Sequence, residues 1–563
     1  MKRKGQRLTI LVTVGISLFL IFTPFSPIAA QTWIQQFPTG TPPAPRYFAG
    51  NAYDEFNDRL ILFSGEVLGI GLPRLTDVWV LSDATGIGDT PSWVELFPVG
   101  EPPLGRESGT VLYDATSNRI IVHGGCSAHC SPALGDTWVL TNANGLGGTP
   151  TWIQLPSASV ARASHSAAYD PSSNRMIIFG GNQAFYGTNR NDVWVLTDAN
   201  GVGSPTWMQL SPTGTPPPPR ESAQVVYDQT TNRMILFGGV QFPNSYTAIN
   251  FNDVWLLTNA NGLGGTPQWI QLSPLGAPPL ARSGHSLLYD SSTNRMILFG
   301  GYFDARPNPN YYMEFNDVWI LTEANGAGGT PQWIELTPAG IPPDARSFHS
   351  VGYITASHRM VGAMGRDYRS GVVFFNDVWV LANANGITMK IETVGPGTFW
   401  VGLKNSDDQG TRFDVRAALY VNDTLVAEGE TLCVTGITRN PSNAKEVTVP
   451  FGPGSSNELV SDDVISLKVF TRIGTNPDGS KCPGHNNAVG LRLYYDSPTR
   501  TSGFGIENSS DQMRDYFLHS ASGTYFLDDA SPTGTAKYKD SSGVNYNNGN
   551  QWKEIGTWSM TLP

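Results

Sequence analysis

The sequence predicts an all-β protein, and three observations support this prediction. The chain of 563 residues contains 61 glycines, 41 prolines and 15 tryptophans, whereas only 15% of its residues are charged. Long α-helices need alanine, leucine, glutamate and lysine in quantity, so this composition instead favours short strands and many turns. Three short motifs recur six times each in the same order, and the segments between turn residues are apolar runs of strand length. An internal repeat of roughly 60 residues predicts a ring or array of small β-sheets.

The repeat is clearest in residues 227–239, YDQTTNRMILFGG, and 289–301, YDSSTNRMILFGG. The tyrosine of this first motif stands at Tyr53, Tyr113, Tyr169, Tyr227, Tyr289 and Tyr353. A second motif, D-[VT]-W-[VIL]-L, places tryptophans at Trp79, Trp138, Trp194, Trp255, Trp319 and Trp379. A third motif contributes Trp33, Trp93, Trp152, Trp207, Trp269 and Trp333. Three markers that recur together define six structural units.

Each unit is predicted to contain four strands, called a to d. In the fifth unit, strand a is RSGHSLLYD (282–290), strand b is RMILFGG, strand c is NDVWIL and strand d is QWIEL. Ser, Thr and Asn form the a–b turn because they bond their own backbone, and a Gly/Asn/Pro-rich segment joins c to d. The continuous apolar run of strand b indicates burial on both faces.

A single four-stranded sheet of this size cannot bury both of its faces. Six such sheets in tandem can bury them by stacking radially as the blades of a β-propeller. The sixth unit ends with DVWVL (377–381) and has no strand d after it. The missing strand stands at the other end of the repeat region, as TWIQQF (32–37). We therefore expect the N-terminal strand to complete the sixth blade and close the ring.

Residues 31–386 resemble the kelch family, whose repeats each form one propeller blade. The glycine pairs after strand b carry the resemblance, together with the tryptophans of strand c: Gly124-Gly125, Gly180-Gly181, Gly238-Gly239 and Gly300-Gly301. Two units depart from the pattern, with Ser64-Gly65 in the first and AMG (363–365) in the sixth. In some kelch domains the arginine at the start of strand a contacts a ligand, so the resemblance implies the same for this chain.

Antiparallel geometry places the d–a and b–c connections on one face of the ring and the a–b and c–d connections on the other. The a–b and c–d segments hardly vary among the six units, which indicates a scaffold, whereas the b–c loops vary in length and content. We expect ligand binding on the d–a/b–c face. The candidate binding residues are Arg46, Arg106, Arg162, Arg220, Arg282, Arg346, Tyr186, Tyr246, Tyr311 and Tyr312.

Each candidate has a structural alternative. The arginines are able to pair with nearby carboxylates, such as Glu107, Glu221 or the aspartate of strand c. The loop aromatics suit stacking on sugars or docking of a protein, but they also suit packing over blade edges; this group also includes Phe185, Phe242, Tyr302 and Phe303. Three histidines, His165, His285 and His349, follow arginines in an R-x-x-H pattern, and a structural role is expected for them rather than zinc binding.

After Gly386 the repeat stops, and short alternating or apolar segments continue between Gly/Asn/Asp/Pro turns. Residues 387–563 are therefore expected to form a β-sandwich or jelly-roll-like domain. The four cysteines predict two disulfides, and the simplest of three connectivities joins Cys126 to Cys130 and Cys433 to Cys482. A metal site at His123, Cys126, His129 and Cys130 is the alternative for the first pair.

The N-terminus predicts export. Residues 1–30 combine four basic residues with an apolar stretch from Leu8 to Phe22 and small residues Ala29 and Ala30, as in a cleaved signal peptide. Its removal changes the formal charge from −11 to −15, and a net negative field disfavours nucleic acid and anionic membranes as partners. No later segment has the length and apolarity of a membrane span.

These observations favour a secreted, non-catalytic protein that binds a glycan or a protein, without a cofactor or metal. The alternative is a carbohydrate-active propeller enzyme, either a sugar epimerase or mutarotase or an oxidase of the galactose-oxidase type. An enzyme would need acid/base groups or metal ligands that converge at the mouth of the ring, whereas a binding protein needs only aromatic and hydrogen-bonding groups there.

Overall fold

The computed structural model describes residues 31–67, 74–127, 132–156, 161–183, 188–307, 312–369, 372–386, 389–452, 458–459, 464–476, 478, 480–484, 487–495, 500, 502–508, 513–521, 524–528, 537–540, 546–547 and 552–561. This part of the chain is almost entirely β-structure, with two short 3₁₀ helices, η1 (Ser406–Asp408) and η2 (Pro441–Asn443). None of the helices in it has the length and apolarity needed to cross a membrane. The predicted signal peptide, residues 1–30, lies outside the described residues.

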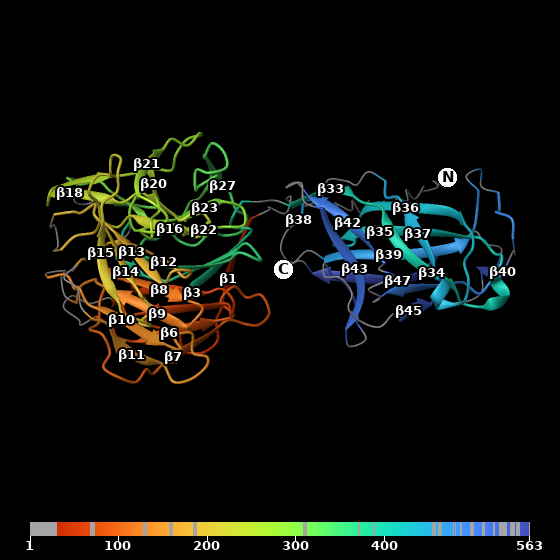
Figure 1. Cartoon of the computed structure of the whole chain (residues 1–563), viewed down its shortest axis with the longest axis horizontal. Helices are drawn as coiled ribbons and strands as arrows, with labels where there is room; N and C mark the ends of the chain where they lie inside the picture. The colour runs from red at the N-terminus through yellow and green to blue at the C-terminus, as the bar shows by residue number, and fades with distance from the viewer. Residues whose placement is uncertain are drawn as a thin grey trace, which may run out of the picture.

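The repeat region forms six four-stranded antiparallel sheets, and each is one blade (Figure 1). Blade 1 contains β3 (Gly50–Asp54), β4 (Arg59–Phe63), β6 (Val78–Ser82) and β7 (Ser92–Leu96). Blade 2 contains β8 (Thr110–Asp114), β9 (Arg119–His123), β10 (Thr137–Thr141) and β11 (Thr151–Gln154). Blade 3 contains β12 (Ser166–Asp170), β13 (Arg175–Phe179), β14 (Val193–Thr197) and β15 (Thr206–Leu210).

Blade 4 contains β16 (Gln224–Asp228), β17 (Arg233–Phe237), β20 (Val254–Thr258) and β21 (Gln268–Leu272). Blade 5 contains β22 (Ser286–Asp290), β23 (Arg295–Phe299), β26 (Val318–Thr322) and β27 (Gln332–Leu336). Blade 6 contains β28 (Ser350–Ile354), β29 (Arg359–Ala363), β32 (Val378–Ala382) and β1 (Thr32–Gln36). The strand order a–b–c–d predicted from the sequence is confirmed in every blade.

The six blades close into a ring. Neighbouring first strands contact each other in the order β3, β8, β12, β16, β22 and β28, and β28 contacts β3 again. The strand from the N-terminus completes blade 6, because β1 pairs with β32 in a register that joins Thr32 to Ala382 and Gln36 to Val378. This pairing confirms the predicted closure, and the ring of sheets is a β-propeller.

The apolar strand b forms the core between neighbouring blades. In blade 1, Leu60 and Leu62 of β4 are fully buried against Val361 and Val378 of blade 6, and Trp93 joins the same cluster. Alternate residues of the strand face opposite blades, so a continuous apolar run is buried on both sides. The packing explains why all six copies of strand b are apolar.

The a–b and c–d connections join neighbouring blades on one face of the ring. Asn144 of blade 2 donates through Nδ2 to the Asp54 carboxylate of blade 1 at 2.7 Å, and Arg59 Nη1 donates to the Asn144 carbonyl at 3.0 Å. The same amide-to-carboxylate bond joins Asn200 to Asp114, Asn261 to Asp170, Asn325 to Asp228 and Asn385 to Asp290. The near-identity of these loops is therefore a packing requirement, as predicted for a scaffold.

Several b–c connections contain additional strands. Blade 4 carries a hairpin of β18 (Val240–Asn244) and β19 (Thr247–Asn250). Further pairs are β24 (Tyr302–Asp304) with β25 (Tyr312–Glu314), β30 (Arg366–Asp367) with β31 (Val373–Phe374), and β2 (Arg46–Tyr47) with β5 (Glu66–Val67). The sequence predicts loops between strands b and c, because these segments vary in length and content among the blades, whereas it places Arg46 and Tyr47 of β2 at the start of strand a.

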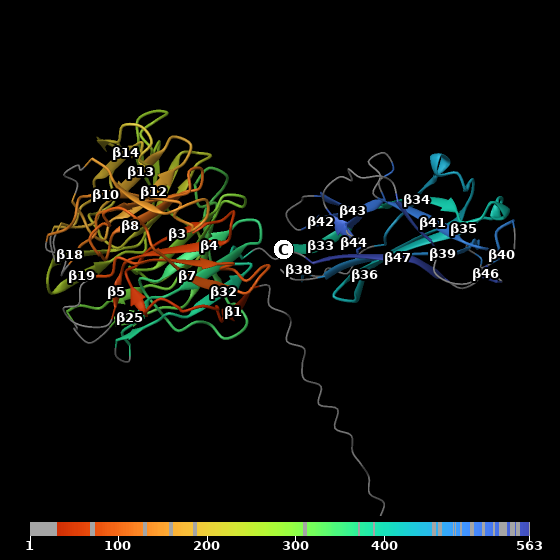
Figure 2. The same cartoon turned by 90° about the horizontal axis from the view of Figure 1, so that it is seen from below.

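The C-terminal region forms two packed sheets (Figure 2). One contains β33 (Met389–Val394), β34 (Gly397–Leu403), β37 (Lys445–Val449), β38 (Glu458–Leu459), β41 (Leu491–Tyr495), β42 (Gly503–Asn508), β43 (Met513–Ala521), β44 (Thr524–Asp528) and β45 (Lys537–Asp540). The other contains β35 (Phe413–Val421), β36 (Thr424–Val434), β39 (Val464–Ile473) and β47 (Lys553–Thr561). A separate two-stranded sheet pairs β40 (Asn487–Ala488) with β46 (Tyr546–Asn547). A shared core that includes Phe399, Leu467 and Trp558 lies between the sheets, as in the predicted β-sandwich.

One predicted disulfide is present in this sandwich. Cys433 and Cys482 are bonded, with their Cα atoms 5.9 Å apart. Cys126 in the propeller is buried and disulfide-bonded, and Cys130 and His129 lie outside the described residues. A disulfide is compatible with an oxidising compartment.

Candidate functional site

The six arginines at the start of each blade are buried and paired. Their exposed fractions are 2% or less, and each guanidinium makes two bonds of 2.6 to 3.1 Å to the aspartate of strand c. The pairs are Arg46–Asp77, Arg106–Asp136, Arg162–Asp192, Arg220–Asp253, Arg282–Asp317 and Arg346–Asp377. This is the structural role that the sequence left open, and direct ligand contact by these arginines stays a prediction.

The three R-x-x-H histidines also lie inside the scaffold. His165 Nε2 lies 3.1 Å from the Thr110 hydroxyl, and His349 Nε2 lies 2.9 Å from the Ser286 hydroxyl. Burial lowers the pKa of His349 to about 3, and it lowers the pKa values of His165 and His285 as well. The rings are therefore neutral and pack between blades, which agrees with the expected structural role.

A ring of backbone hydrogen bonds narrows the channel above strand a. The residue two positions after each arginine has a left-handed backbone, with φ between 52° and 59°: Phe48, Ser108, Ser164, Ser222, Gly284 and Phe348. Neighbouring members are joined by N–H to carbonyl bonds of 2.8 to 3.3 Å at five of the six steps. The left-handed residue interrupts the extended chain, so strand a begins four residues after the arginine. The sequence predicts that strand a begins at the arginine itself. We call these six residues the constriction ring.

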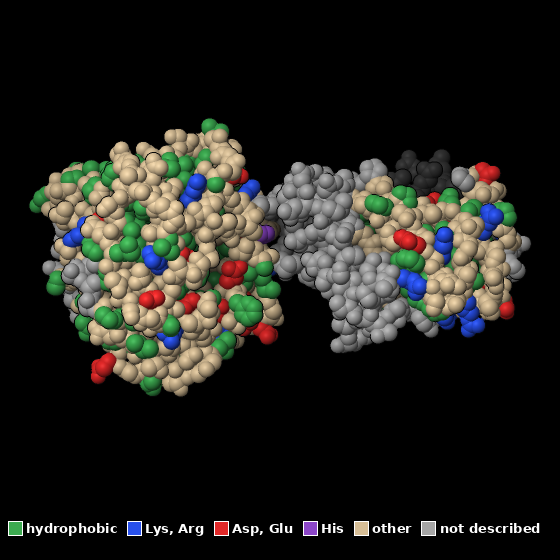
Figure 3. Space-filling view, viewed as in Figure 1, with side chains coloured by type: hydrophobic (Ala, Val, Ile, Leu, Met, Phe, Trp, Pro, Cys, Tyr) green, Lys and Arg blue, Asp and Glu red, His purple; other side chains and the backbone are tan. Residues whose placement is uncertain are grey.

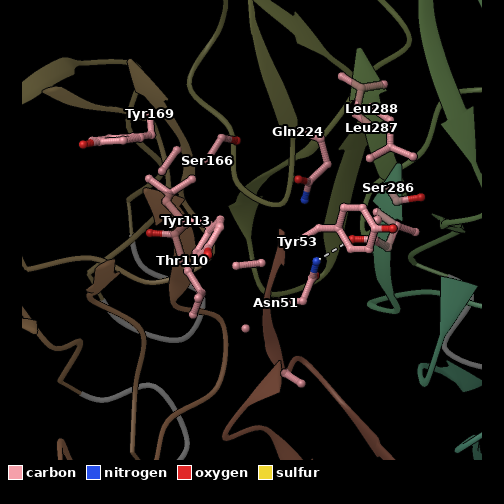
Figure 4. Close-up of a pocket in the computed structure, with 18 of the residues that line it drawn as sticks. Asn51, Tyr53, Thr110, Tyr113, Ser166, Tyr169, Gln224, Ser286, Leu287 and Leu288 are labelled. Atoms are coloured by element: carbon pink, nitrogen blue, oxygen red, sulfur yellow. Dashed lines mark hydrogen bonds between the residues drawn. The ribbon is translucent and has the colours of Figure 1, made fainter. Parts of the chain in front are cut away.

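Below the constriction ring lies a central cavity of about 590 Å³, lined by the strands a (Figure 4). Tyr53, Tyr113, Asn51 and Gln224 border it, and Asn51 Nδ2 donates to the Val351 carbonyl at 2.8 Å. Several of the bordering groups already bond to scaffold atoms; the Tyr53 hydroxyl, for example, donates to Asp58 at 2.6 Å. The lining also includes Glu55 and the three R-x-x-H histidines, whose pKa values are lowered by burial.

Above the constriction ring lies a second cavity of about 370 Å³, which we call the mouth cavity. It lies on the d–a/b–c face, where the sequence predicts binding. Besides five residues of the constriction ring, its lining consists of aromatic, charged and amide side chains: Tyr47, Glu66, Arg74, Glu107, Asn182, Glu221, Phe242, Tyr302, Asp304, Arg306, Tyr312, Arg366 and Tyr368. Its volume falls within the range of about 300–1,000 Å³ that is usual for small-ligand sites.

Two carboxylates share one side of the mouth cavity. Arg74 Nη2 lies 3.2 Å from Glu66 and 3.0 Å from Glu107, and the Tyr47 hydroxyl donates to Glu66 at 2.5 Å. Burial and the hydrogen bond to Glu66 raise the pKa of Glu107 to about 7. Burial opposes ionisation of Glu66 too, but the hydrogen bonds from Glu107 and Tyr47 and the charge of Arg74 hold its pKa below the usual value. The pair therefore offers one acid and one base near neutral pH.

Other acidic groups of the mouth are buried in the blade 4–5 wall. Glu221 accepts bonds from the side-chain amides of Asn182 and Asn189, and its pKa is raised by burial. Just behind the cavity lining, burial raises the pKa of Glu314 to about 8, and Ser347 Oγ donates to it at 3.2 Å. These two carboxyl groups are held mostly by neutral donors, so burial favours their protonated forms.

Of the loop aromatics predicted to bind, Tyr312 lines the mouth cavity. Tyr246 lies at the turn between β18 and β19 with 76% of its surface exposed, away from the cavity lining. Tyr186 and Tyr311 lie outside the described residues. Phe242 and Tyr302, in contrast, are buried in the cavity wall. These two aromatic side chains therefore both pack against the scaffold and line the cavity, which are the two roles that the sequence left open.

Sequence reasoning points to Glu107 and Glu221 but misses Glu66, Arg74 and Arg366. Glu66 and Arg366 directly follow the glycine that ends the b strand, and Tyr47 directly follows the repeated arginine. In each blade these two positions face each other, as in the Tyr47↔Glu66 and Ser347↔Arg366 pairs. The sequence signal that could have identified them is the following. The residue after each repeated arginine and the residue after each strand-b glycine stand at fixed positions in the repeat, but their side chains differ from blade to blade. Arg74 carries no such signal.

Charged side chains on the visible surface of the propeller are scattered singly among polar and apolar ones (Figure 3). Among the described residues, the one group of three metal-binding residue types is Asp414 with Cys433 and Cys482. The two sulfurs of that group are bonded to each other, so they are not available as thiolate ligands.

Comparisons with known proteins agree on the repeat type. Residues 149–263 match the KLHDC2/KLHL20/DRC7 Kelch-repeats domain. The chain is 26% identical over 272 residues to the F-box/kelch-repeat protein At1g51550 of Arabidopsis thaliana, covering 44% of this chain and 54% of that protein. It is 27% identical over 198 residues to Kelch domain-containing protein 2 of Bos taurus, covering 32% of this chain and 44% of that protein. The chain thus spans about half the length of the curated relatives it matches.

Solved structures of similar shape include YjhT, with a TM-score of 0.42 and 14% identity over 60% of this chain and 95% of that chain. A fungal alcohol oxidase of the AA5 family in complex with copper has a TM-score of 0.39 and 13% identity, covering 81% of this chain and 98% of that chain. The repeated glycine pairs, the ring of four-stranded sheets and the kelch matches lead to one conclusion: the propeller of this chain is built from kelch-type repeats.

Proposed function

We propose that the protein binds a glycan through the mouth cavity of its propeller. The observation that carries this proposal is the lining of the cavity, in which the aromatic side chains of Tyr302, Tyr312 and Tyr368 stand beside carboxylate, amide and guanidinium groups. Sugars present apolar C–H faces and many hydroxyl groups, so they need aromatic surface and polar groups together. The opposite face of the ring carries loops whose polar groups already join one blade to the next.

The kelch matches support a binding role for the propeller. One matched relative is a Rab9 effector protein with kelch motifs from Xenopus laevis, which is 28% identical over 35% of this chain. A protein ligand is therefore the competing outcome. A protein interface of standard size buries roughly 800 Å² on each partner, whereas the recessed mouth cavity suits a small ligand.

The proposed location is outside the cytoplasm. The basic and apolar pattern of residues 1–30 supports export, and the Cys433–Cys482 bond is compatible with it. An exported binding protein would meet free sugars and surface glycans. N-terminal sequencing of the protein from culture medium would test this, because it should then begin near Gln31.

A glycan array followed by calorimetry on the exported chain tests the binding proposal. Replacing Tyr312 by Ala removes an aromatic surface from the cavity wall, so we expect affinity for the best glycan to fall by roughly 5–30-fold, the effect of losing about 1–2 kcal/mol. Phe56 lies on an a–b turn of the other face with 92% of its surface exposed, and Phe56→Ala should leave affinity unchanged. Equal losses in both variants, or no glycan bound by the wild type, would reject the proposal.

The Glu66–Glu107 pair favours a second candidate function, the interconversion of sugar anomers. The Glu107 carboxyl group would protonate the ring oxygen while the Glu66 carboxylate takes the proton of the anomeric hydroxyl, which breaks the C1–O bond of the ring. Closure on the other face of the aldehyde returns both protons in the reverse sense. No cofactor is needed, and the pair already holds one proton-bearing and one ionised carboxyl group near neutral pH.

Exchange between anomers, measured by NMR on reducing sugars that bind, tests this candidate. We expect Glu107→Gln to slow the catalysed exchange by about 10²-fold or more, because it removes the proton donor. The rate should fall as pH rises through about 7, where Glu107 loses its proton. Glu101 is exposed on a d–a connection, so Glu101→Gln is the control. An exchange rate in wild type equal to that of buffer would eliminate catalysis and leave the binding proposal standing.

A further inference from the structure

Arg366 occupies an unusual place in the wall of the mouth cavity. It lies on β30 in blade 6, directly after Gly365, and its backbone pairs with Ser347. The guanidinium carbon lies 4.4 Å from the ring centre of Tyr47, 4.8 Å from that of Phe348 and 4.2 Å from that of Tyr368. The ring of Phe48 is 5.4 Å away. Four aromatic rings thus surround one cation and hold its position.

The hydrogen bonds of Arg366 leave donors unused. Nη1 donates to the Tyr368 hydroxyl at 3.0 Å, whereas Nε is buried without a hydrogen-bond partner. Within the described part of the chain, no carboxylate lies close enough to Arg366 to form an ion pair. Its charge nevertheless acts across the cavity, because it contributes to the lowered pKa of Glu66 and partly offsets the rise that burial causes in the pKa of Glu314. The planar guanidinium is therefore oriented by stacking rather than by a protein acid.

The other two cations of the cavity are matched by acids. Arg74 pairs with Glu66 and Glu107, and Arg306 forms a fork with Asp304 whose shortest contact is 2.5 Å. Burial also favours the protonated forms of Glu107 and Glu221. After these pairs are formed, the positive charge that remains in the cavity is that of Arg366.

We propose that Arg366 binds the anionic group of an acidic sugar in the mouth cavity. A carboxylate or a sulfate presents two oxygens that match the guanidinium fork, and such paired, charge-assisted bonds are short and strong. Partial burial beneath aromatic rings strengthens the attraction because less water screens it. This inference rests on the proposed glycan binding and adds the charge of the glycan to it.

Calorimetry with matched sugars tests the inference. The ligands are galacturonic acid, galactose and galactose 6-sulfate, which differ in the presence and type of the anionic group. We expect the wild-type chain to bind one of the two acidic sugars at least tenfold more tightly than galactose. Arg366→Gln should weaken binding of that acidic sugar about 30-fold or more and change the affinity for galactose little.

Two further variants and a melting experiment distinguish three causes of a lower affinity: loss of the positive charge, loss of the planar guanidinium group and loss of folding. Arg366→Lys keeps the cation but loses the planar fork, so it should recover only part of the affinity. Arg369 is half-exposed and pairs with Asp367 away from the cavity lining, and Arg369→Gln should behave as the wild type. Thermal melting of each variant checks that the propeller is intact.

The outcomes are distinguishable. Tighter binding of galactose than of both acidic sugars, or an unchanged affinity for the acidic sugar in a folded Arg366→Gln variant, would overturn the role of Arg366 and leave glycan binding intact. The absence of binding to all three sugars and to a wider glycan array would reject the inference together with the proposed function. A preference for the carboxylate or for the sulfate would identify the anionic group.

Discussion

Replacing Asp377 by Ala is expected to lower the free energy of unfolding of the propeller by about 3 kcal/mol or more. Arg346 is 1% exposed, and its guanidinium makes two bonds of 2.7 and 2.9 Å to Asp377. The same carboxylate accepts the indole N–H of Trp379 at 2.7 Å. The variant would leave a buried cation without its anion and an indole without its acceptor. Urea unfolding followed by tryptophan fluorescence measures the change.

Asp344 provides the matched control for this experiment. Its side chain is exposed in the same blade, and Arg346 contacts only its backbone carbonyl. Asp344→Ala should therefore stay within about 0.5 kcal/mol of the wild type. The Arg346 ion pair lowers the pKa of Asp377 despite burial, so its stabilisation is present above the unfolded pKa of about 3.9 and is lost as pH falls towards the folded pKa. A difference between Asp377→Ala and wild type that does not shrink in acid would contradict the assigned role.

Replacing Gly300 by Ala is the second change with a large expected effect, also about 3 kcal/mol of destabilisation. Gly300 has a φ of +65°, where a side chain is strained, and an added Cβ would lie 2.7 Å from the Arg346 carbonyl oxygen and 3.0 Å from His349. That carbonyl also accepts the N–H of Gly301 at 2.9 Å. The new methyl group would therefore push apart blades 5 and 6. Thermal and urea unfolding measure the loss.

Gly362 provides a control in the same part of the ring. It lies in β29 with an ordinary φ, and the nearest atom to an added Cβ, in the Phe299 ring, is 3.9 Å away. Gly362→Ala should be neutral or stabilise by a few tenths of a kcal/mol, because alanine restricts the unfolded chain. If Gly300→Ala proved as mild as Gly362→Ala, the close approach of the glycine pair to the next blade would not explain the repeated motif.

The sequence allows the blades to be predicted because each blade repeats the same local constraints. An apolar strand b and a tryptophan in strand c recur in all six blades, and a glycine pair follows strand b in four of them, so the repeat is visible without a structure. The same reasoning predicts ring closure, because the strand missing after residue 381 stands at Trp33. The β-sandwich is predicted less specifically, since its strands follow no repeat and only their alternation is visible.

The mouth cavity is harder to predict because most of its lining residues are not repeated from one blade to the next. Tyr47 and Arg366 are far apart in the sequence, and only ring closure brings blade 6 beside blade 1. The repeated arginines attract attention because of their charge, but charge at a six-fold repeated position is explained by the six aspartates of strand c. The residues beside them, at equally fixed positions, form the cavity wall.

Closure of the ring by β1 also has a consequence for how the chain is made. Ala382 is synthesised about 350 residues after its partner Thr32, which takes roughly 20–70 s at 5–20 residues per second. During that interval β32 does not exist, and the apolar flank of blade 1 that blade 6 will cover stays open to water. The first propeller strand to be made is thus the last to be paired, and a chaperone that protects the nascent propeller would be needed longest at β1 and blade 1.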